Sequence, residues 1–201
     1  MGKPKFSYEF RNGSLNTDIV EARYAYINKP DPDYDRFSIT VVLDPDDTST
    51  KELFDTTLDF ENEVRAKQGL DVVEIPANWT RKGKPSKDDK GMWLVSIAMK
   101  PLDKDNNPRS PKVYDIFGKE DSTIQIWGGD RVIVQFGLGV WYDKDTAGSK
   151  YFLSAVQQIK SGSGGGTSGF ADMSGVVAKE SMAKVNTLID TPDEDDDGIP
   201  F

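Results

Sequence analysis

The last nine residues of the chain combine a run of acidic side chains with a short apolar end. They read Asp193-Glu194-Asp195-Asp196-Asp197-Gly198-Ile199-Pro200-Phe201. As the final residue, Phe201 would carry both an aromatic ring and a terminal carboxylate. A partner could therefore enclose the ring and pair the carboxylate with Arg or Lys, while the acidic run guides the segment toward a basic rim. We predict a partner-binding tip made of Asp195, Asp196, Asp197, Ile199, Pro200 and Phe201. The alternative is an acidic tail that aids solubility.

Two stretches of the body bring basic and aromatic side chains together. One runs from Trp79 to Lys87 and is followed by Trp93, and the other runs from Lys100 to Tyr114. This mixture suits unpaired nucleic acid, because phosphates need a positive groove and each base stacked on an aromatic ring contributes about 1–3 kcal/mol. The predicted DNA-contacting residues are Trp79, Arg81, Lys82, Lys84, Lys87, Trp93, Arg109, Lys112, Tyr114, Tyr24 and Tyr26.

A structural role competes with DNA contact at each of these positions. Aromatic side chains on strands usually belong to the core, and a Lys-rich loop is usually just solvated. Tyr24 and Tyr26 share one face at strand spacing beside Arg23. For this pair the sequence leaves base stacking and core packing equally open.

Catalytic and metal-binding chemistry finds little support in the sequence. The chain has no His and no Cys, which removes the usual general base and the commonest transition-metal ligands. The run Asp103-x-Asp105-x-Asn107 begins like a calcium loop, but Pro108 stands where that loop needs Gly. The carboxylates otherwise scatter without a compact motif. We predict a non-enzymatic protein with no metal and no cofactor.

The net charge of −9 is concentrated at the end of the chain. Six of the 34 acidic residues lie in 190–201, which contains no base, so residues 1–189 hold 28 acidic and 25 basic residues, or −3. The body is thus close to balanced and compatible with binding phosphates. No apolar stretch reaches membrane-spanning length, and Met1 to Lys5 lacks the apolar core of a signal peptide. We expect a soluble cytoplasmic protein that contacts no membrane.

The elements that must position these residues are mostly strands. Alternating, β-branched or aromatic runs predict strands at 21–27, 34–43, 92–100, 113–117, 131–142 and 150–159. Gly137 and Gly139 would allow a bulge or sharp coiling in the fifth of these. Ser49-Thr50-Lys51-Glu52 reads as a capping box for a helix that would end near Gly69.

The order of segments predicts one domain and a tail. Residues 1–160 would form the domain, and the Gly/Ser-rich 161–189 would form a flexible linker with a short helix as an option. Residues 190–201 would form the disordered acidic tail, because so little apolar surface cannot offset the entropy lost on ordering.

The acidic tip ending in Ile199-Pro200-Phe201 resembles the C-terminal tip of bacterial and phage single-stranded-DNA-binding proteins. The order of a β-rich body, a linker and an acidic tip extends the resemblance, and the long loops make the chain look more like a phage-encoded member. The resemblance implies a mainly β fold, an OB-like five-stranded antiparallel barrel with long loop insertions and one helix. It also implies that the barrel coats and protects single-stranded DNA during replication and recombination, and that the tip docks on replication, repair and recombination proteins.

Two other functions stay open at this point. The chain could be an interaction protein that does not bind DNA, whose acidic tail recruits or mimics nucleic acid at a host replication or repair protein. It could also prefer duplex DNA or RNA. If the protein is phage-encoded, its expected location is the cytoplasm of the bacterial host.

Overall fold

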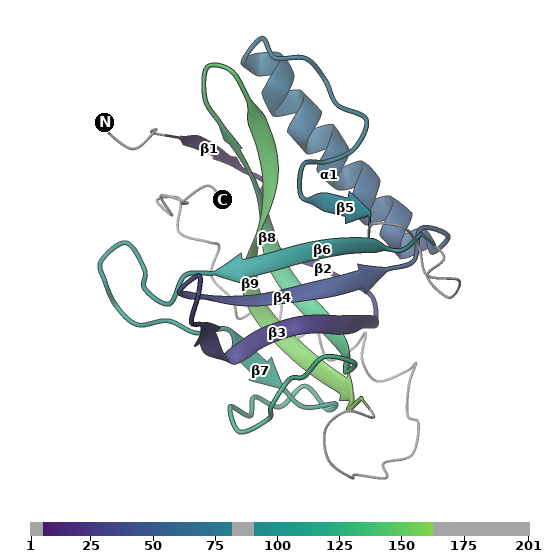
Figure 1. Ribbon diagram of the computed structural model, residues 1–201, viewed down its shortest axis with the longest axis vertical. Helices are drawn as coiled ribbons and strands as arrows, with labels where there is room; N and C mark the ends of the chain where they lie inside the picture. The colour runs from purple at the N-terminus through teal and green to yellow at the C-terminus, as the bar shows by residue number, and fades with distance from the viewer. Residues whose placement is uncertain (1–5, 82–90, 163–201) are drawn as a thin grey trace.

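Five strands close into a barrel in the computed structural model, which describes residues 6–81 and 91–162 (Figure 1). The ring order is β3–β4–β6–β9–β8 and back to β3, antiparallel at every step except the parallel pair β6–β9. This connectivity is that of a small OB-type barrel, and it confirms the predicted fold class. The five strands are β3 (Val20–Asp31), β4 (Arg36–Leu43), β6 (Trp93–Met99), β8 (Arg131–Tyr142) and β9 (Ala147–Lys160).

Four shorter strands extend the sheet beyond the ring. β1 (Ser7–Phe10) and β2 (Leu15–Asn16) pair with β8, β5 (Trp79–Arg81) pairs with β6, and β7 (Lys112–Tyr114) pairs with β9 in parallel. Sequence patterns predicted β7 approximately and missed the other three. A strand of two to four residues shows too few alternations to be recognised from the sequence.

Strands β8 and β9 form a long hairpin that runs the length of the molecule behind the crossing strands β3, β4 and β6 (Figure 1). Gly139 allows a close approach rather than the predicted bulge, since a Cβ there would lie 2.8 Å from the Phe152 ring. The register with β9 shifts elsewhere, once between Arg131 and Val132 and once between Gln135 and Phe136, and in each case β9 carries one residue more. Gln135 pairs with Ala155 and Phe136 with Leu153, which leaves Ser154 as the extra residue.

Helix α1 (Thr48–Lys67) lies along the upper half of this hairpin (Figure 1). Its N-cap is Asp47, whose carboxylate accepts a hydrogen bond from the Ser49 amide. The predicted capping box is therefore wrong, and the Ser49 hydroxyl instead donates to Asp47 at 2.8 Å. Gly69, with φ of 72°, follows the last turn as predicted. Among the residues that the structure describes, no helix is long and apolar enough to cross a membrane.

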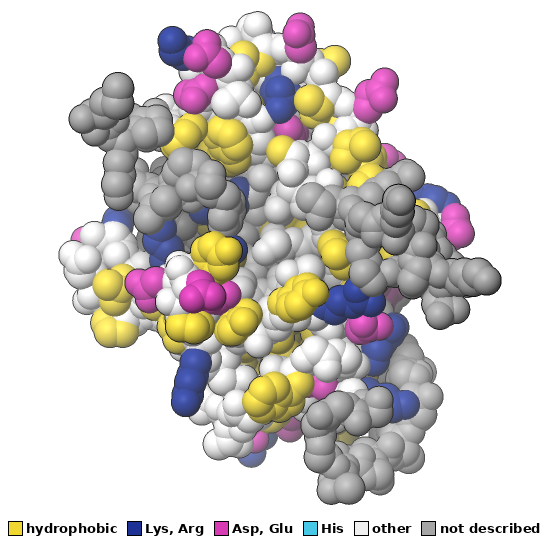
Figure 2. Space-filling view, in the orientation of Figure 1, with side chains coloured by type: hydrophobic (Ala, Val, Ile, Leu, Met, Phe, Trp, Pro, Cys, Tyr) yellow, Lys and Arg dark blue, Asp and Glu magenta, His cyan; other side chains and the backbone are white. Residues whose placement is uncertain are grey.

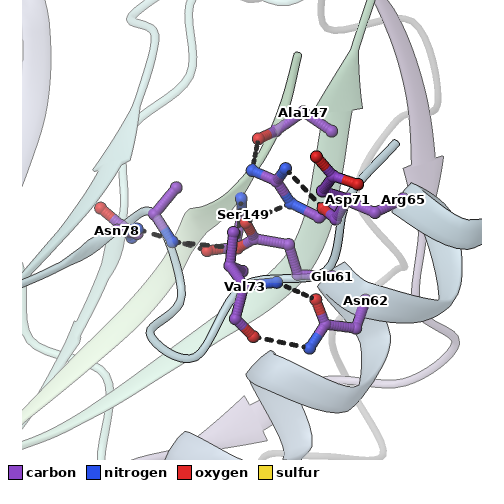
Figure 3. A network of polar contacts seen from close by, with 9 residues as sticks. Glu61, Asn62, Arg65, Asp71, Val73, Asn78, Ala147 and Ser149 are labelled. Carbon is purple, nitrogen blue, oxygen red and sulfur yellow. Dashed lines mark hydrogen bonds and ion pairs between the residues drawn. The ribbon is translucent and has the colours of Figure 1, made fainter.

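A buried carboxylate docks the helix on the barrel (Figure 3). Glu61 is fully buried and accepts hydrogen bonds from the Arg65 guanidinium at 3.1 Å and from the amides of Ala77 and Ser149, both at 3.0 Å. These donors come from the helix, the following loop and β9. The network therefore fixes the loop that leads into β5. The buried charge of Glu61 is tolerated because its hydrogen bonds are satisfied.

Candidate nucleic-acid interface

A β-bulge in β3 turns two tyrosines outward. Arg23 pairs with Thr40 and Tyr26 with Ser38, so β3 carries one residue more than β4 over this stretch. The bulge includes Tyr24, whose φ of 45° lies in the left-handed region that residues other than Gly seldom adopt. The extra residue shifts the alternation of the strand. As a result Tyr24 is 71% exposed and Tyr26 39% exposed.

The turn between β3 and β4 adds a third exposed tyrosine. Tyr34 is 62% exposed, and the Arg36 guanidinium lies 4.9 Å from the centre of its ring. The buried Asp31 shapes this turn by accepting a hydrogen bond from the Asp33 amide at 2.9 Å. Burial lowers the pKa of Arg36, and the Asp31 carboxylate opposes that shift. Arginine remains cationic at neutral pH because its ordinary pKa is so high.

An exposed tryptophan stands on the segment that runs beside β3. Trp127 is 55% exposed and belongs to residues 124–130. Asn28 of β3 donates to the Ile124 carbonyl at 2.6 Å, and the Gly129 amide donates to the Ala22 carbonyl at 2.8 Å. The buried Asp130 carboxylate accepts from the Trp127 amide at 3.0 Å. These bonds hold the segment next to the outward tyrosines of β3.

Small side chains lie between the aromatic ones on the outer face of β3, β4 and β6. Tyr26 pairs with Ser38, and Ser38 pairs with Ala98 of β6. Directly paired residues on neighbouring strands point to the same face. Ser38 and Ala98 therefore project less far from the sheet than the aromatic side chains beside them. Figure 2 shows hydrophobic side chains interspersed with both basic and acidic side chains on this side of the molecule. Such a face can stack bases on rings and pair phosphates with guanidinium groups.

The structure places three of the predicted stacking residues inside the protein. Trp79 is 4% and Trp93 is 7% exposed, and Tyr114 is buried as well. The Trp79 ring packs 5.8 Å from Trp93, and its Nε1 donates to the Tyr151 hydroxyl at 2.8 Å. Burial raises the pKa of Tyr114, as does the nearby Glu120. Their prediction as base-stacking residues is corrected on physical grounds, because a ring enclosed in the core offers no face to a base.

The predicted basic residues do not form one described cluster. Arg109 uses its Nε to donate to the Lys100 carbonyl at 3.0 Å, which closes the loop after β6. Lys112 is exposed at the start of β7. Arg81 ends β5. Lys82, Lys84 and Lys87 lie outside the described residues, as do the tip residues Asp195, Asp196, Asp197, Ile199, Pro200 and Phe201.

The loop that resembled the start of a calcium site is satisfied by its own backbone. The Asp103 carboxylate accepts from the amides of Asn107 at 2.7 Å and Asp105 at 2.9 Å. The hydrogen bonds from the side chain and then the backbone of Asn107 hold the pKa of Asp103 below its ordinary value. Within residues 6–81 and 91–162, no group of three or more acidic side chains is arranged to hold a metal ion.

Sequence reasoning missed Tyr34, Arg36 and Trp127 as candidate interface residues. Their local sequences carry a usable signal. Tyr34 follows Asp31-Pro32-Asp33, and Trp127 precedes Gly128-Gly129. Both are turn sequences, and an aromatic residue in a turn is more often exposed than one inside a strand.

Comparison with known proteins identifies solved structures of the same fold. No protein-family model and no curated protein matches the sequence. The single-stranded DNA-binding protein gp2.5 of bacteriophage T7 is 20% identical with a TM-score of 0.59, over 85% of this chain and 100% of that one. The single-stranded DNA-binding protein of bacteriophage Enc34 is 18% identical with a TM-score of 0.58, over 82% and 90%. The Enc34 protein in complex with single-stranded DNA is 19% identical with a TM-score of 0.58, over 75% and 88%. The chain therefore shares its fold with single-stranded DNA-binding proteins of bacteriophages.

Proposed function

We propose that this chain is a non-enzymatic protein that binds single-stranded DNA on the outer face of β3 and β4. The observation that carries the proposal is the outward set Tyr24, Tyr26 and Tyr34 on a barrel of this fold. A structural relative with the same fold has been solved with single-stranded DNA. The proposed role is to coat and protect single strands during phage replication and recombination, in the cytoplasm of the bacterial host.

Binding proceeds through charge and stacking together. Arg36, beside the Tyr34 ring, attracts the phosphates, and the release of counterions from the DNA favours binding at low salt. Unpaired bases then stack on the tyrosine rings, which accept any base because every base has a π-face. Binding should therefore vary little with sequence and weaken as salt rises.

The acidic tip is proposed to serve two purposes. Its ring and carboxylate would dock on replication, repair or recombination proteins. It would also compete with DNA for the basic face of its own barrel. The chain leading to residues 163–201 departs from Gly162, whose amide donates to Asp130 at 2.7 Å, close to the segment that carries Trp127. A tethered tip has an effective concentration of order mM, so even a weak contact with the interface would compete.

The experiment that tests DNA binding titrates the protein into fluorescently labelled oligo-dT and follows anisotropy at several salt concentrations. We expect affinity that falls with salt, and weaker competition from duplex DNA and RNA. Absence of binding at low salt would reject the proposal. It would leave the second candidate, an interaction protein whose acidic tail acts on a host protein.

Deletion of residues 190–201 tests the tip separately. The truncated protein should bind oligo-dT more tightly than the full chain at low salt, and the difference should narrow as salt screens the tip. Equal affinities at low salt would argue against self-competition while leaving DNA binding untouched. Deletion of Phe201 alone, tested against candidate replication proteins, examines the docking role.

A further inference from the structure

Strand β1 places a second group of aromatic rings on the outside of the β8–β9 hairpin. Tyr8 and Phe10 lie on one face of β1 with ring centres 5.9 Å apart and planes at 17°. Phe152 of β9 packs against them, with ring centres 5.3 Å from Phe10 and 6.4 Å from Tyr8. We call Tyr8, Phe10 and Phe152 the β1 aromatic cluster. Tyr8 and Phe10 are half-buried, whereas Phe152 is buried beneath them.

Strand register connects this cluster to the outward tyrosines of β3. Tyr26 pairs with Ser38, Ser38 with Ala98, and Ala98 with Phe152. The four residues form one row across β3, β4, β6 and β9, on the outer side of the barrel. Three strand spacings separate its ends, or about 15 Å. Ser38 and Ala98 carry small side chains, and Ser38 is itself buried, so no large side chain of the row stands between Tyr26 and Phe152.

A positive charge accompanies the β1 aromatic cluster. The Lys150 Nζ lies 5.0 Å from the centre of the Phe152 ring and 6.0 Å from that of Tyr8. An ammonium over aromatic rings is a favourable arrangement, and it puts a cation beside surfaces on which bases can stack. The interface around Tyr34 and Arg36 shows the same pairing of ring and cation.

We propose that the β1 aromatic cluster is a second base-stacking subsite. One single strand would run from Tyr24 and Tyr26 across Ser38 and Ala98 to Tyr8 and Phe10. This inference rests on the proposed function and specifies the path of the DNA. β1 lies outside the five-stranded ring, so the barrel by itself does not supply this subsite. Continuity of the outer face and the Lys150 charge both favour single-stranded DNA as its occupant.

The competing explanation is that the cluster serves to pack β1 onto the hairpin. The contact between Phe10 and Phe152 would then stabilise the fold, and so would the buried part of the Tyr8 side chain. The two explanations differ in what they require of an aromatic ring at position 8. Packing is served nearly as well by Leu, whereas stacking needs a flat π-face.

The test compares Tyr8→Leu with Tyr8→Phe in the full chain, using labelled oligo-dT of two lengths. Lengths of about 5 and about 15 nucleotides lie near the two ends of the range of about 4–16 nucleotides that one OB fold binds. We expect Tyr8→Leu to weaken binding of the longer oligomer about fivefold or more, as the loss of one stacked base implies. Its affinity for the shorter oligomer should fall less, because a short strand can bind at the tyrosines of β3 alone, and Tyr8→Phe should match the wild type for both.

A second measurement keeps the inference testable if Tyr8→Leu fails to fold. The wild-type protein is cross-linked by ultraviolet light to iodouracil-substituted oligo-dT of the longer length, and the modified peptides are identified by mass spectrometry. Cross-links within residues 6–10 support the subsite. Unchanged affinity of folded Tyr8→Leu for the longer oligomer, or no cross-link in this segment, overturns it. Wild-type protein that binds neither oligomer would instead reject the proposed function itself.

Discussion

Replacing both Tyr24 and Tyr26 with Leu should remove much of the affinity for single-stranded DNA. Tyr24 is 71% exposed, so its ring contributes little to the buried core, and Leu at φ of 45° is strained about as much as Tyr. If each ring stacks one base, the double variant loses about 2–6 kcal/mol of binding free energy. Since 1.4 kcal/mol is a factor of ten, the dissociation constant should rise at least about 30-fold.

The assay is anisotropy of labelled oligo-dT at several salt concentrations, with urea denaturation to verify folding. The double variant removes no charge, so the slope of log affinity against log salt should stay that of the wild type. Tyr24→Phe with Tyr26→Phe is the matched control, because it keeps both rings and should bind as the wild type does. A folded Leu variant with wild-type affinity would refute the assignment of this face as the stacking surface.

Three further predictions concern single side chains. Trp127→Phe should reduce the tryptophan quenching on oligo-dT binding, because Trp79 and Trp93 are buried whereas Trp127 is exposed, and the quenching that remains should come from the half-buried Trp141, which pairs with Tyr8; full quenching in the variant would show that DNA does not contact Trp127. Gly139→Ala should lower the free energy of unfolding in urea by about 1–3 kcal/mol, because its Cβ would meet the Phe152 ring at 2.8 Å. A stability equal to the wild type would show that the ring moves aside without cost. Tyr151→Phe should destabilise by about 1–3 kcal/mol, since it leaves the buried Trp79 Nε1 without its acceptor, and it should leave oligo-dT affinity unchanged. Loss of affinity there would show that the core and the interface are coupled.

Local sequence patterns were sufficient for the long elements. The run Arg131–Tyr142 was predicted with its observed bounds, because apolar residues occupy every second position from Val132 to Val140. The helix was predicted from its periodicity and from Gly69, while its start was misplaced. Asp47 and Ser49 are both acceptable N-caps by residue type. Which of them caps the helix depends on the path of the chain between β4 and α1.

The tertiary structure decided whether each aromatic side chain points into the core or to the solvent. Tyr24 and Tyr26 follow Ala22 at even spacing, so regular alternation would place them in the core, and the bulge reverses that. Trp79 and Trp93 stand beside a basic loop in the sequence, yet they pack together beneath helix α1. Burial depends on which strands close the ring and where an extra residue enters a strand. Neither is encoded in the neighbouring few residues.

The sequence by itself determined the composition and the order of the parts. The absence of His and Cys in the sequence and the run of acidic residues before Ile199-Pro200-Phe201 follow from the sequence alone, and the role of that tip stays a prediction. Tertiary structure decided what the body offers to a partner. The pairing of β4 with β6 and of β6 with β9 brings residues that are distant in sequence, such as Tyr26 and Phe152, into one row. Pairing between strands is a long-range property, and no local pattern specifies it.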